Sequence, residues 1–157
     1  MLESDLDTLC EMLKRCDDVA DKLDFFKLDH KGWIANPYVR DSFLVSVSQI
    51  GELYAHTTAG ICRDLFPNIP WKQVKALRNI IVHAYVDVDY ERIWEYINSD
   101  IPELRETLLT NEIVRERYQS DSEILENSLD DLYENYLSQH PNALSQCSCS
   151  ARDVENR

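Results

Sequence analysis

The chain has 157 residues, a formal net charge of −13, 44% hydrophobic residues and only three glycines. This length suits one domain with a short extension, and the composition favours a helical globular protein. The charge excludes a protein that coats nucleic acid through general basicity, but a local basic site remains compatible with it.

The five cysteines are odd in number and form no C-x-x-C pair, which argues against a disulfide framework. Cys10 and Cys16 fall in a helical pattern and are expected in the core or at its boundary. Cys147-Ser148-Cys149 lies in a polar tail, and the lack of a second pair argues against a metal site there. No basic leader precedes an apolar run, and no segment approaches roughly 18 apolar residues. We therefore expect a reduced, cytoplasmic protein with no cofactor and no membrane contact.

The N-terminal part of the chain carries apolar residues at alternating spacings of three and four. This periodicity predicts a long helix that starts at a capping box of Ser4 and Asp7 and ends near Phe26. The following segment, residues 28–36, is expected to be a loop with Trp33 packed against the bundle.

A second helix is predicted from Asn36 and Pro37, a cap followed by proline at the first helical position, to about Thr58. Gly51 in its middle costs roughly 1 kcal/mol relative to alanine, which indicates that another backbone passes close by. Residues 61–66 are expected to form a short helical turn before a proline-rich connection.

The C-terminal half continues the helical pattern. Asp89 is expected to cap a helix, and Asp100 before Ile101-Pro102 marks a new helix start or a kink. The last helix of the bundle is expected to extend through 113–118 and to break at 120–122. A further amphipathic helix is then predicted, with Leu125, Leu129, Leu132, Tyr136 and Leu137 on its apolar side.

No segment predicts a strand, and there is no internal repeat, so the fold class is all-α, a helical bundle. We expect the bundle over 1–110, a helical C-terminal extension over 111–139 and a disordered tail over 140–157. The acidic run over 123–134 is interpreted as a solvated helix face.

The segment most informative about function runs from Trp71 to Tyr85 and reads W-K-Q-V-K-A-L-R-N-I-I-V-H-A-Y. On a helix that turns about 100° per residue, its aliphatic side chains gather on one side. The opposite side collects cationic, hydrogen-bonding and titratable groups: Lys72, Lys75, Arg78, Asn79, His83 and Tyr85. One side is therefore expected to be core and the other a candidate site.

Spacing within this sector favours a pair of chains. Arg78 and Tyr85 are seven apart and nearly eclipsed, and Asn79 and His83 are one turn apart. Arg78 and His83, however, diverge by about 140° on an ideal helix. They share a site within one chain only if the helix is distorted; otherwise a partner must bring a second copy, which favours a symmetric dimer.

Each residue also has a simpler interpretation. An isolated histidine on a helix is most often a surface residue, and Arg78 alone is most often in a salt bridge, here with Glu52 as a candidate partner. Tyr85 at a helix end is usually a boundary aromatic.

Taken together, the group favours RNA chemistry. A guanidinium suits the charge of a phosphorane-like transition state, and an imidazole suits general acid–base work on a hydroxyl. No metal-ligand motif is present, and RNA carries its own nucleophile in the 2′-hydroxyl. The expected products are a 2′,3′-cyclic phosphate and a 5′-hydroxyl.

Residues 78–85, R-N-I-I-V-H-A-Y, have the form R-x-x-x-x-H-x-Y. Three surrounding segments complete the pattern: Gln49-Ile50-Gly51-Glu52, Phe66-Pro67-Asn68-Ile69-Pro70-Trp71, and Asp87-Val88-Asp89 followed by Trp94. Over roughly residues 1–110, this set resembles the HepT-like branch of the HEPN ribonucleases. Those proteins are toxins paired with a minimal nucleotidyltransferase antitoxin, MntA.

The resemblance implies an up-and-down HEPN bundle whose dimer brings two motif helices face to face. Arg78 and His83 of both chains would form a composite, metal-independent site, supported by Asn79, Lys75 and Glu52. Tyr85 would be the residue to which the antitoxin transfers AMP, and an adenylate there would neutralise Arg78 and block the RNA path. The expected partners are a second copy, an MntA-like antitoxin and RNA.

Two alternatives stay open at this point. In the first, the chain forms a catalytically idle dimer that binds a nucleotide or a nucleotidyltransferase partner. In the second, it is a purely structural bundle. The segment after residue 110 has no counterpart in the family pattern; it covers the bundle, extends the dimer interface or contacts the antitoxin.

Overall fold

The computed structural model describes residues 1–58, 60–82 and 88–140, and only the backbone of residues 80–82. Contacts divide the chain into two compact units, Met1–Tyr118 and Gln119–Arg157. Every regular element in the described part is helical, which confirms the expected all-α class. None of the helices described there has the length and apolar character needed to cross a bilayer.

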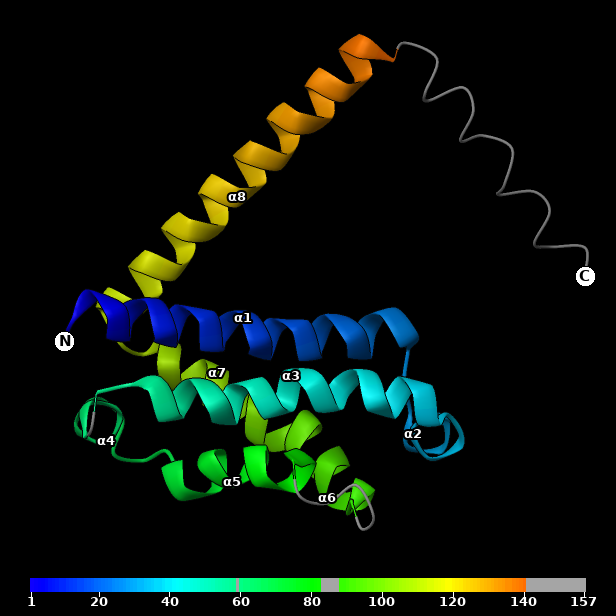
Figure 1. Ribbon diagram of the computed structural model, residues 1–157, viewed down its shortest axis with the longest axis vertical. Helices are drawn as coiled ribbons and strands as arrows, with labels where there is room; N and C mark the ends of the chain where they lie inside the picture. Colours follow the sequence, from blue (N-terminus) through cyan, green and yellow to red (C-terminus); the bar gives the residue numbers. More distant parts are fainter. Residues whose placement is uncertain (59, 83–87, 141–157) are drawn as a thin grey trace, which may run out of the picture. The chain divides into compact units, whose positions relative to one another are not determined.

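The first unit is a bundle organised around one central helix. Its elements are α1 (Glu3–Phe26), α2 (His30–Ala35), α3 (Pro37–His56), α4 (Ile61–Leu65), α5 (Trp71–Val82), α6 (Tyr90–Glu95), the π-helical turn η1 (Tyr96–Asp100), α7 (Ile101–Leu109) and the beginning of α8 (Glu112–Gln139). In Figure 1, α1, α3 and α5 lie side by side in that order. The long helix α3 packs against both α1 and α5, while α1 also packs on α7.

The sequence signals for two helix starts are confirmed. Asn36 caps α3, its side-chain oxygen accepting the N–H of Val39 at 3.2 Å, and Pro37 takes the first helical position. Asp89 caps α6 by accepting the N–H of Arg92 at 3.0 Å. Both caps satisfy backbone donors that a helix start leaves unpaired.

The segment 28–36, expected to be a loop, is instead largely the short helix α2. Its N-cap is Asp29, whose carboxylate accepts the N–H of Gly32 at 2.7 Å. These residues form a helix rather than a loop because Trp33, which is fully buried as expected, packs the segment against the core. The Trp33 indole donates to the backbone oxygen of Tyr90 at 3.0 Å, so burial leaves no polar atom of the ring unpaired.

The start of α1 also differs from the expectation. The helix begins at Glu3, and Asp5, rather than Ser4 or Asp7, supplies the side chain that binds the first turn. Asp5 is 2% exposed, accepts the N–H of Leu2 at 3.3 Å and accepts the N–H of Thr58 at 2.7 Å. This carboxylate therefore ties the start of α1 to the chain that leaves α3. The hydrogen bond from the Thr58 backbone is the main cause that lowers the pKa of Asp5.

We expect Asp5 to stabilise the fold in a pH-dependent way. Because its pKa is lowered on folding, the stabilisation is complete above the ordinary aspartate pKa of about 3.9 and is lost as the pH falls through the lower folded-state value. Asp5→Asn should therefore unfold at lower urea than the native protein at pH 7, and the gap should narrow towards pH 3. Asp21→Asn, at an exposed position on the same helix, is the control. A gap that stays constant with pH would contradict this role.

The cysteines of α1 lie in the core, as expected. Cys10 and Cys16 are each 2% exposed. Burial raises the pKa of the Cys16 thiol to about 12, so this sulfur stays protonated and inert in the folded protein. Cys147 and Cys149 lie outside the described residues.

Of the two outcomes expected at Asp100 and Ile101-Pro102, a helix start is observed. The π-helical turn η1 ends at Asp100 and α7 begins at Ile101, with Pro102 in its first turn. The break expected at residues 120–122 is absent. The helix α8 runs through them, because serine and aspartate weaken a helix only slightly and neither glycine nor proline is present.

The first turns of α8 belong to the first unit and cover part of α1. Val114 is fully buried, and the Arg117 guanidinium lies 3.0 Å from the carboxylate of Asp7. The Tyr118 hydroxyl donates to Asp17. Of the roles left open for the segment after residue 110, covering the bundle is thus observed for these turns. In the second unit, α8 continues to Gln139. The tail expected to be disordered is 140–157. Its first residue, His140, is described and donates its backbone N–H to the oxygen of Tyr136 at 3.0 Å, and residues 141–157 lie outside the described residues.

Candidate functional site

The candidate site is built where α3 crosses α5. A Cβ added at Gly51 would lie 2.8 Å from the backbone nitrogen of Arg78 and 2.8 Å from the backbone oxygen of Val74. Real Cβ atoms do not approach backbone atoms so closely, so the two helices meet at a distance that glycine alone permits without adjustment. The close approach inferred from Gly51 is confirmed, and it sets Glu52 of α3 beside Arg78 of α5.

A shared carboxylate links three side chains at this crossing. One oxygen of Glu52 lies 2.5 Å from Nε of Arg78, and the other lies 3.5 Å from Nε2 of His56. The Arg78 and Glu52 side chains are 45% and 42% exposed. Ion pairs in water add little stability, so the effect of this pair is mainly to hold the guanidinium in place. Arg78 makes no other ion pair or hydrogen bond with the described residues, which leaves its terminal nitrogens available to an anion.

His56 is a member of this group that the sequence analysis missed. The signal was present, since Glu52 and His56 are four residues apart and share one face of α3. Only the fold reveals that this face meets α5 at Arg78.

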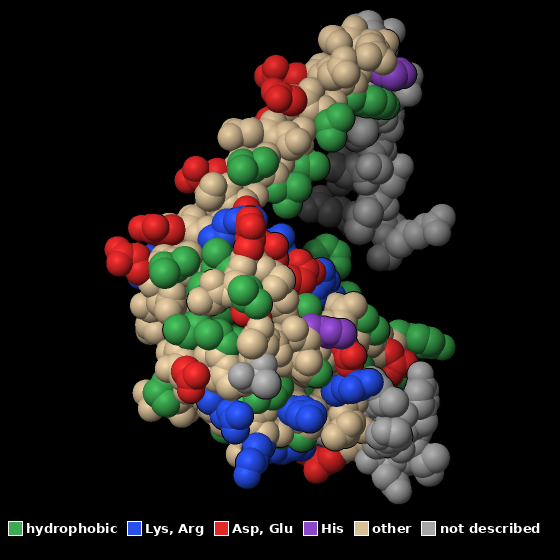
Figure 2. All heavy atoms as spheres, turned by 60° about the vertical axis from the view of Figure 1, so that its left-hand side comes forward, with side chains coloured by type: hydrophobic (Ala, Val, Ile, Leu, Met, Phe, Trp, Pro, Cys, Tyr) green, Lys and Arg blue, Asp and Glu red, His purple; other side chains and the backbone are tan. Residues whose placement is uncertain are grey.

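The remaining cations of α5 extend the site along the helix. Lys72 and Lys75 are exposed and precede Arg78 at intervals of three residues, and Asn79 is also exposed. Lys75 and Arg63 line a shallow hollow of 240 Å³ between the end of α3 and α4. Figure 2 shows lysine and arginine side chains gathered on the lower part of one face, next to a histidine. A chain of net charge −13 thus carries one local surface suited to phosphates.

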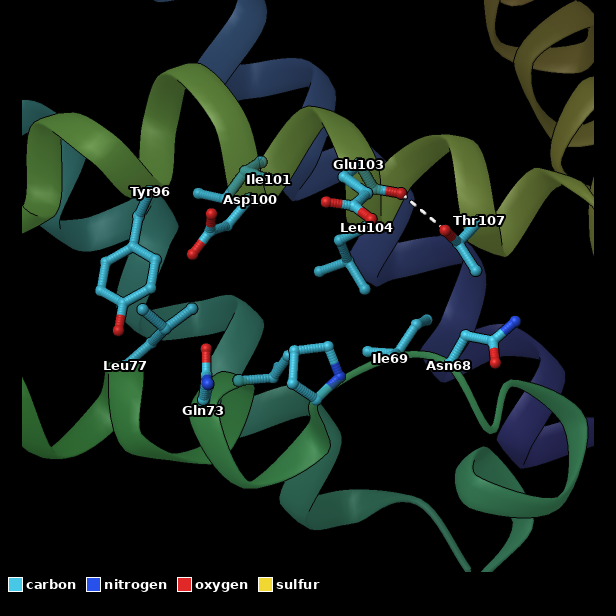
Figure 3. A pocket seen from close by; sticks show the side chains of 12 residues that line it. Asn68, Ile69, Gln73, Leu77, Tyr96, Asp100, Ile101, Glu103, Leu104 and Thr107 are labelled. Atoms are coloured by element: carbon cyan, nitrogen blue, oxygen red, sulfur yellow. Dashed lines mark hydrogen bonds between the residues drawn. The ribbon is translucent and has the colours of Figure 1, made fainter.

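A larger hollow, of 390 Å³, lies between the first turns of α5 and the η1–α7 segment. Gln73, Asp100 and Glu103 point into it over a floor that includes Leu77 and Leu104 (Figure 3). Its lining contains two carboxylates and no lysine or arginine. This pocket is therefore unsuited to a phosphodiester, and the exposed face of α5 is the better candidate.

Comparison with known proteins identifies the class of this bundle. Residues 9–110 match the model of a family described as ribonuclease HepT-like. The chain belongs to the HepT-like ribonuclease family. This assignment confirms the resemblance seen in the motif residues and the ribonuclease class that it implied.

Curated relatives agree with this HepT-like assignment. "Putative RNase MJ1380" from Methanocaldococcus jannaschii is 32% identical over 98 residues, which cover 62% of this chain and 86% of the relative. "Putative RNase MJ0125" from the same organism is 30% identical over 98 residues, covering 62% and 81%. "Probable ribonuclease HepT" from Thermococcus cleftensis is 39% identical over 57 residues, covering 34% and 52%. No solved structure gives a significant match.

The structure places four of the six predicted site residues of this HepT-like protein. Glu52 and Arg78 are in contact, and Lys75 and Asn79 are exposed on α5 next to Arg78. His83 and Tyr85 lie outside the described residues. Within the described ranges, no group of three or more histidine, cysteine, aspartate or glutamate side chains is placed to hold a metal ion.

Proposed function

We propose that this HepT-like chain is the toxin of a HepT/MntA-type (type VII) toxin–antitoxin system, a metal-independent endoribonuclease with a composite dimer site. The observation that carries the proposal is the exposed Arg78, held by Glu52 at a glycine-dependent helix crossing and followed five residues later by His83. A solvent-exposed arginine that an ion pair holds in place beside lysines is well suited to bind phosphate, whereas an exposed ion pair adds little to the stability of the fold.

In the proposed reaction, the terminal nitrogens of Arg78 bind the scissile phosphate and stabilise the charge that grows on its oxygens. His83 removes the proton of the 2′-hydroxyl, whose oxygen attacks the neighbouring phosphorus. The bond to the 5′-oxygen breaks, and that oxygen takes a proton, for which the second His83 of the dimer is the candidate donor. The products are a 2′,3′-cyclic phosphate and a 5′-hydroxyl. Lys75 and Asn79 would position the strand.

A second chain is part of this proposal because of helix geometry. Residues five apart diverge by about 140° on an ideal helix, so Arg78 and His83 of one chain face different directions. A symmetric dimer with opposed α5 helices would bring each Arg78 to the partner's His83.

We include control by covalent modification in the same proposal. Tyr85 is seven residues from Arg78, two turns along the predicted helix, and is the residue to which an MntA-like antitoxin would transfer AMP. An adenylate at that position would bring a phosphodiester charge to the guanidinium and occupy the RNA path.

The test is cleavage of total cellular RNA by the purified protein in excess EDTA, with end-group analysis. Arg78→Ala and His83→Ala should each lower the rate by about 10²–10³-fold, as the loss of one transition-state donor or base does elsewhere. Lys31→Ala, at an exposed lysine of α2, should cleave normally. Equal cleavage by all variants, or products without a cyclic phosphate, would refute the proposed site. An inactive protein should carry the mass of one AMP on Tyr85.

A second candidate is favoured by the net charge of −13, which opposes tight binding of RNA. In that alternative the chain is an idle dimer that binds a nucleotide or a nucleotidyltransferase through Arg78, Asn79 and Tyr85. Growth assays separate the two, since His83→Ala relieves growth inhibition only if the protein is a ribonuclease. An inactive protein without the AMP mass would support the second candidate.

A further inference from the structure

Positive charge in this acidic chain is concentrated in one segment. Between Glu52 and Asp87 the sequence contains four of the 16 lysines and arginines but only one, Asp64, of the 29 aspartates and glutamates. The four cations are Arg63 of α4 and Lys72, Lys75 and Arg78 of α5. The first three are exposed and, unlike Arg78, form no ion pair with a described residue. They are therefore available to a ligand with several negative charges.

A hollow of 500 Å³ lies next to these cations, between α4 and the first turn of α5. We call it the α4 hollow. Arg63 and Lys72 line it together with four apolar residues, Pro67, Ile69, Pro70 and Trp71, and its described lining contains no carboxylate. Its volume is in the range of small-ligand sites, and the N-terminal end of α5 favours negative charge nearby. Apolar surface beside cations suits a nucleotide, which combines the flat face of a base with an anionic phosphate.

Arg63 connects the α4 hollow to the candidate site. It also lines the 240 Å³ hollow that contains Lys75. Lys72, Lys75 and Arg78 follow one another at three residues, so they extend over about 9 Å of α5 and wind by about 60° at each step. This line passes from the α4 hollow, along the end of α3, to Arg78 beside Glu52. A strand held at Arg78 by one phosphate therefore has further cations along its path.

We propose that the α4 hollow is a subsite for an unpaired nucleotide of the RNA strand, beyond the phosphate that Arg78 binds. Arg63 and Lys72 bind the phosphates of that nucleotide, and its base lies over Pro67 and Pro70. The inference rests on the proposed ribonuclease function. Bases inside a duplex are stacked and paired and cannot enter such a hollow, so the subsite selects single-stranded RNA. Arg63 is thus a positioning residue, which adds affinity for the strand without touching the reacting atoms.

The binding test uses the full chain and a fluorescent single-stranded RNA of about 12 nucleotides, a length typical of such sites. Methylation of each 2′-oxygen prevents its cleavage. In fluorescence anisotropy this strand should bind at least tenfold more tightly than the same strand annealed to its complement. Arg63→Ala and Lys72→Ala should each reduce the slope of log affinity against log salt by about 0.7, the value for one phosphate contact of a single strand. Lys31→Ala removes the same charge from an exposed position on α2 and should leave the slope unchanged.

Cleavage distinguishes a positioning role from a structural one. With the unmethylated strand, Arg63→Ala should raise KM about tenfold, as the loss of a charged contact does, and leave kcat nearly unchanged. Arg63→Lys should restore most of the affinity. A dinucleotide that is too short to reach the α4 hollow should be cleaved equally by the native protein and Arg63→Ala. Thermal unfolding of each variant should match that of the native protein, because these side chains are exposed.

Several results would overturn the proposal. Equal affinity for the single strand and the duplex would remove the nucleotide subsite, and so would competition by polyglutamate as strong as that by RNA. A salt slope that Arg63→Ala leaves unchanged, or that Lys31→Ala lowers as much, would remove Arg63 from the path of the strand. Cleavage that depends on Arg78 and His83 but not on Arg63 would leave the proposed function standing without the subsite. Specific binding without any cleavage would refute the proposed function and keep the subsite.

Discussion

Replacing Trp33 by alanine should destabilise the folded protein by about 3–5 kcal/mol, the range for a large aromatic residue removed from a core. Trp33 is fully buried, and its ring lies 5.6 Å from those of Phe43 and Trp94. It joins α2 to α3 and α6, so the cavity cannot close by movement of one element alone. Urea unfolding followed by circular dichroism measures the loss.

Trp33→Phe separates packing from hydrogen bonding at the same position. Phenylalanine keeps most of the ring but leaves the Tyr90 carbonyl without its 3.0 Å donor, so a cost of about 1–3 kcal/mol is expected. If Trp33→Phe were as damaging as Trp33→Ala, the hydrogen bond rather than the packing would dominate. If neither variant shifted the urea midpoint, Trp33 would not be the core residue that its burial indicates.

Replacing Gly51 by alanine should destabilise the protein by about 1–3 kcal/mol, although alanine is normally the better helix residue by about 1 kcal/mol. The steric effect dominates because the new Cβ would meet backbone atoms of Val74 and Arg78 at 2.8 Å, and backbone cannot rotate away. The helices α3 and α5 must separate, which moves Glu52 from Arg78. RNA cleavage should therefore fall together with stability.

Gly32→Ala is the matched control for this variant. A Cβ at Gly32 would meet side-chain atoms of Asp29 and Leu28 at 3.3 and 3.4 Å, and such atoms can adjust. Its effect on the urea midpoint should be small and its RNA cleavage normal. A Gly51→Ala protein that matches Gly32→Ala in both measurements would show that the crossing tolerates a wider spacing.

Local signals were sufficient for much of this fold. Asn36 with Pro37, and Asp89, are caps whose partners lie within three residues, so the sequence alone locates these helix starts. Gly51 was informative because glycine inside a helix lowers stability, and the close approach of another backbone is one of the few reasons for it to be there.

Long-range partners account for the failures. Asp5 accepts a hydrogen bond from Thr58, 53 residues away. A local sequence pattern therefore could not indicate that Asp5, rather than Ser4 or Asp7, binds the start of α1. The helix α2 forms because elements distant in sequence bury Trp33. This burial outweighs the weak helix propensity of residues 30–35. His56 joins the site only through the crossing of α3 and α5.

The Glu52–Arg78 pair has a consequence for which anions the site selects. A ligand with one phosphate that binds the terminal nitrogens of Arg78 is repelled by the Glu52 carboxylate on Nε, and it has little else with which to offset that repulsion. A polyanion that reaches Lys72 and Lys75 at the same time gains several weak contacts in one binding event. The neighbouring carboxylate thus disfavours free phosphate and mononucleotides relative to an extended strand. Removing the carboxylate would raise the affinity for small anions and reduce that discrimination.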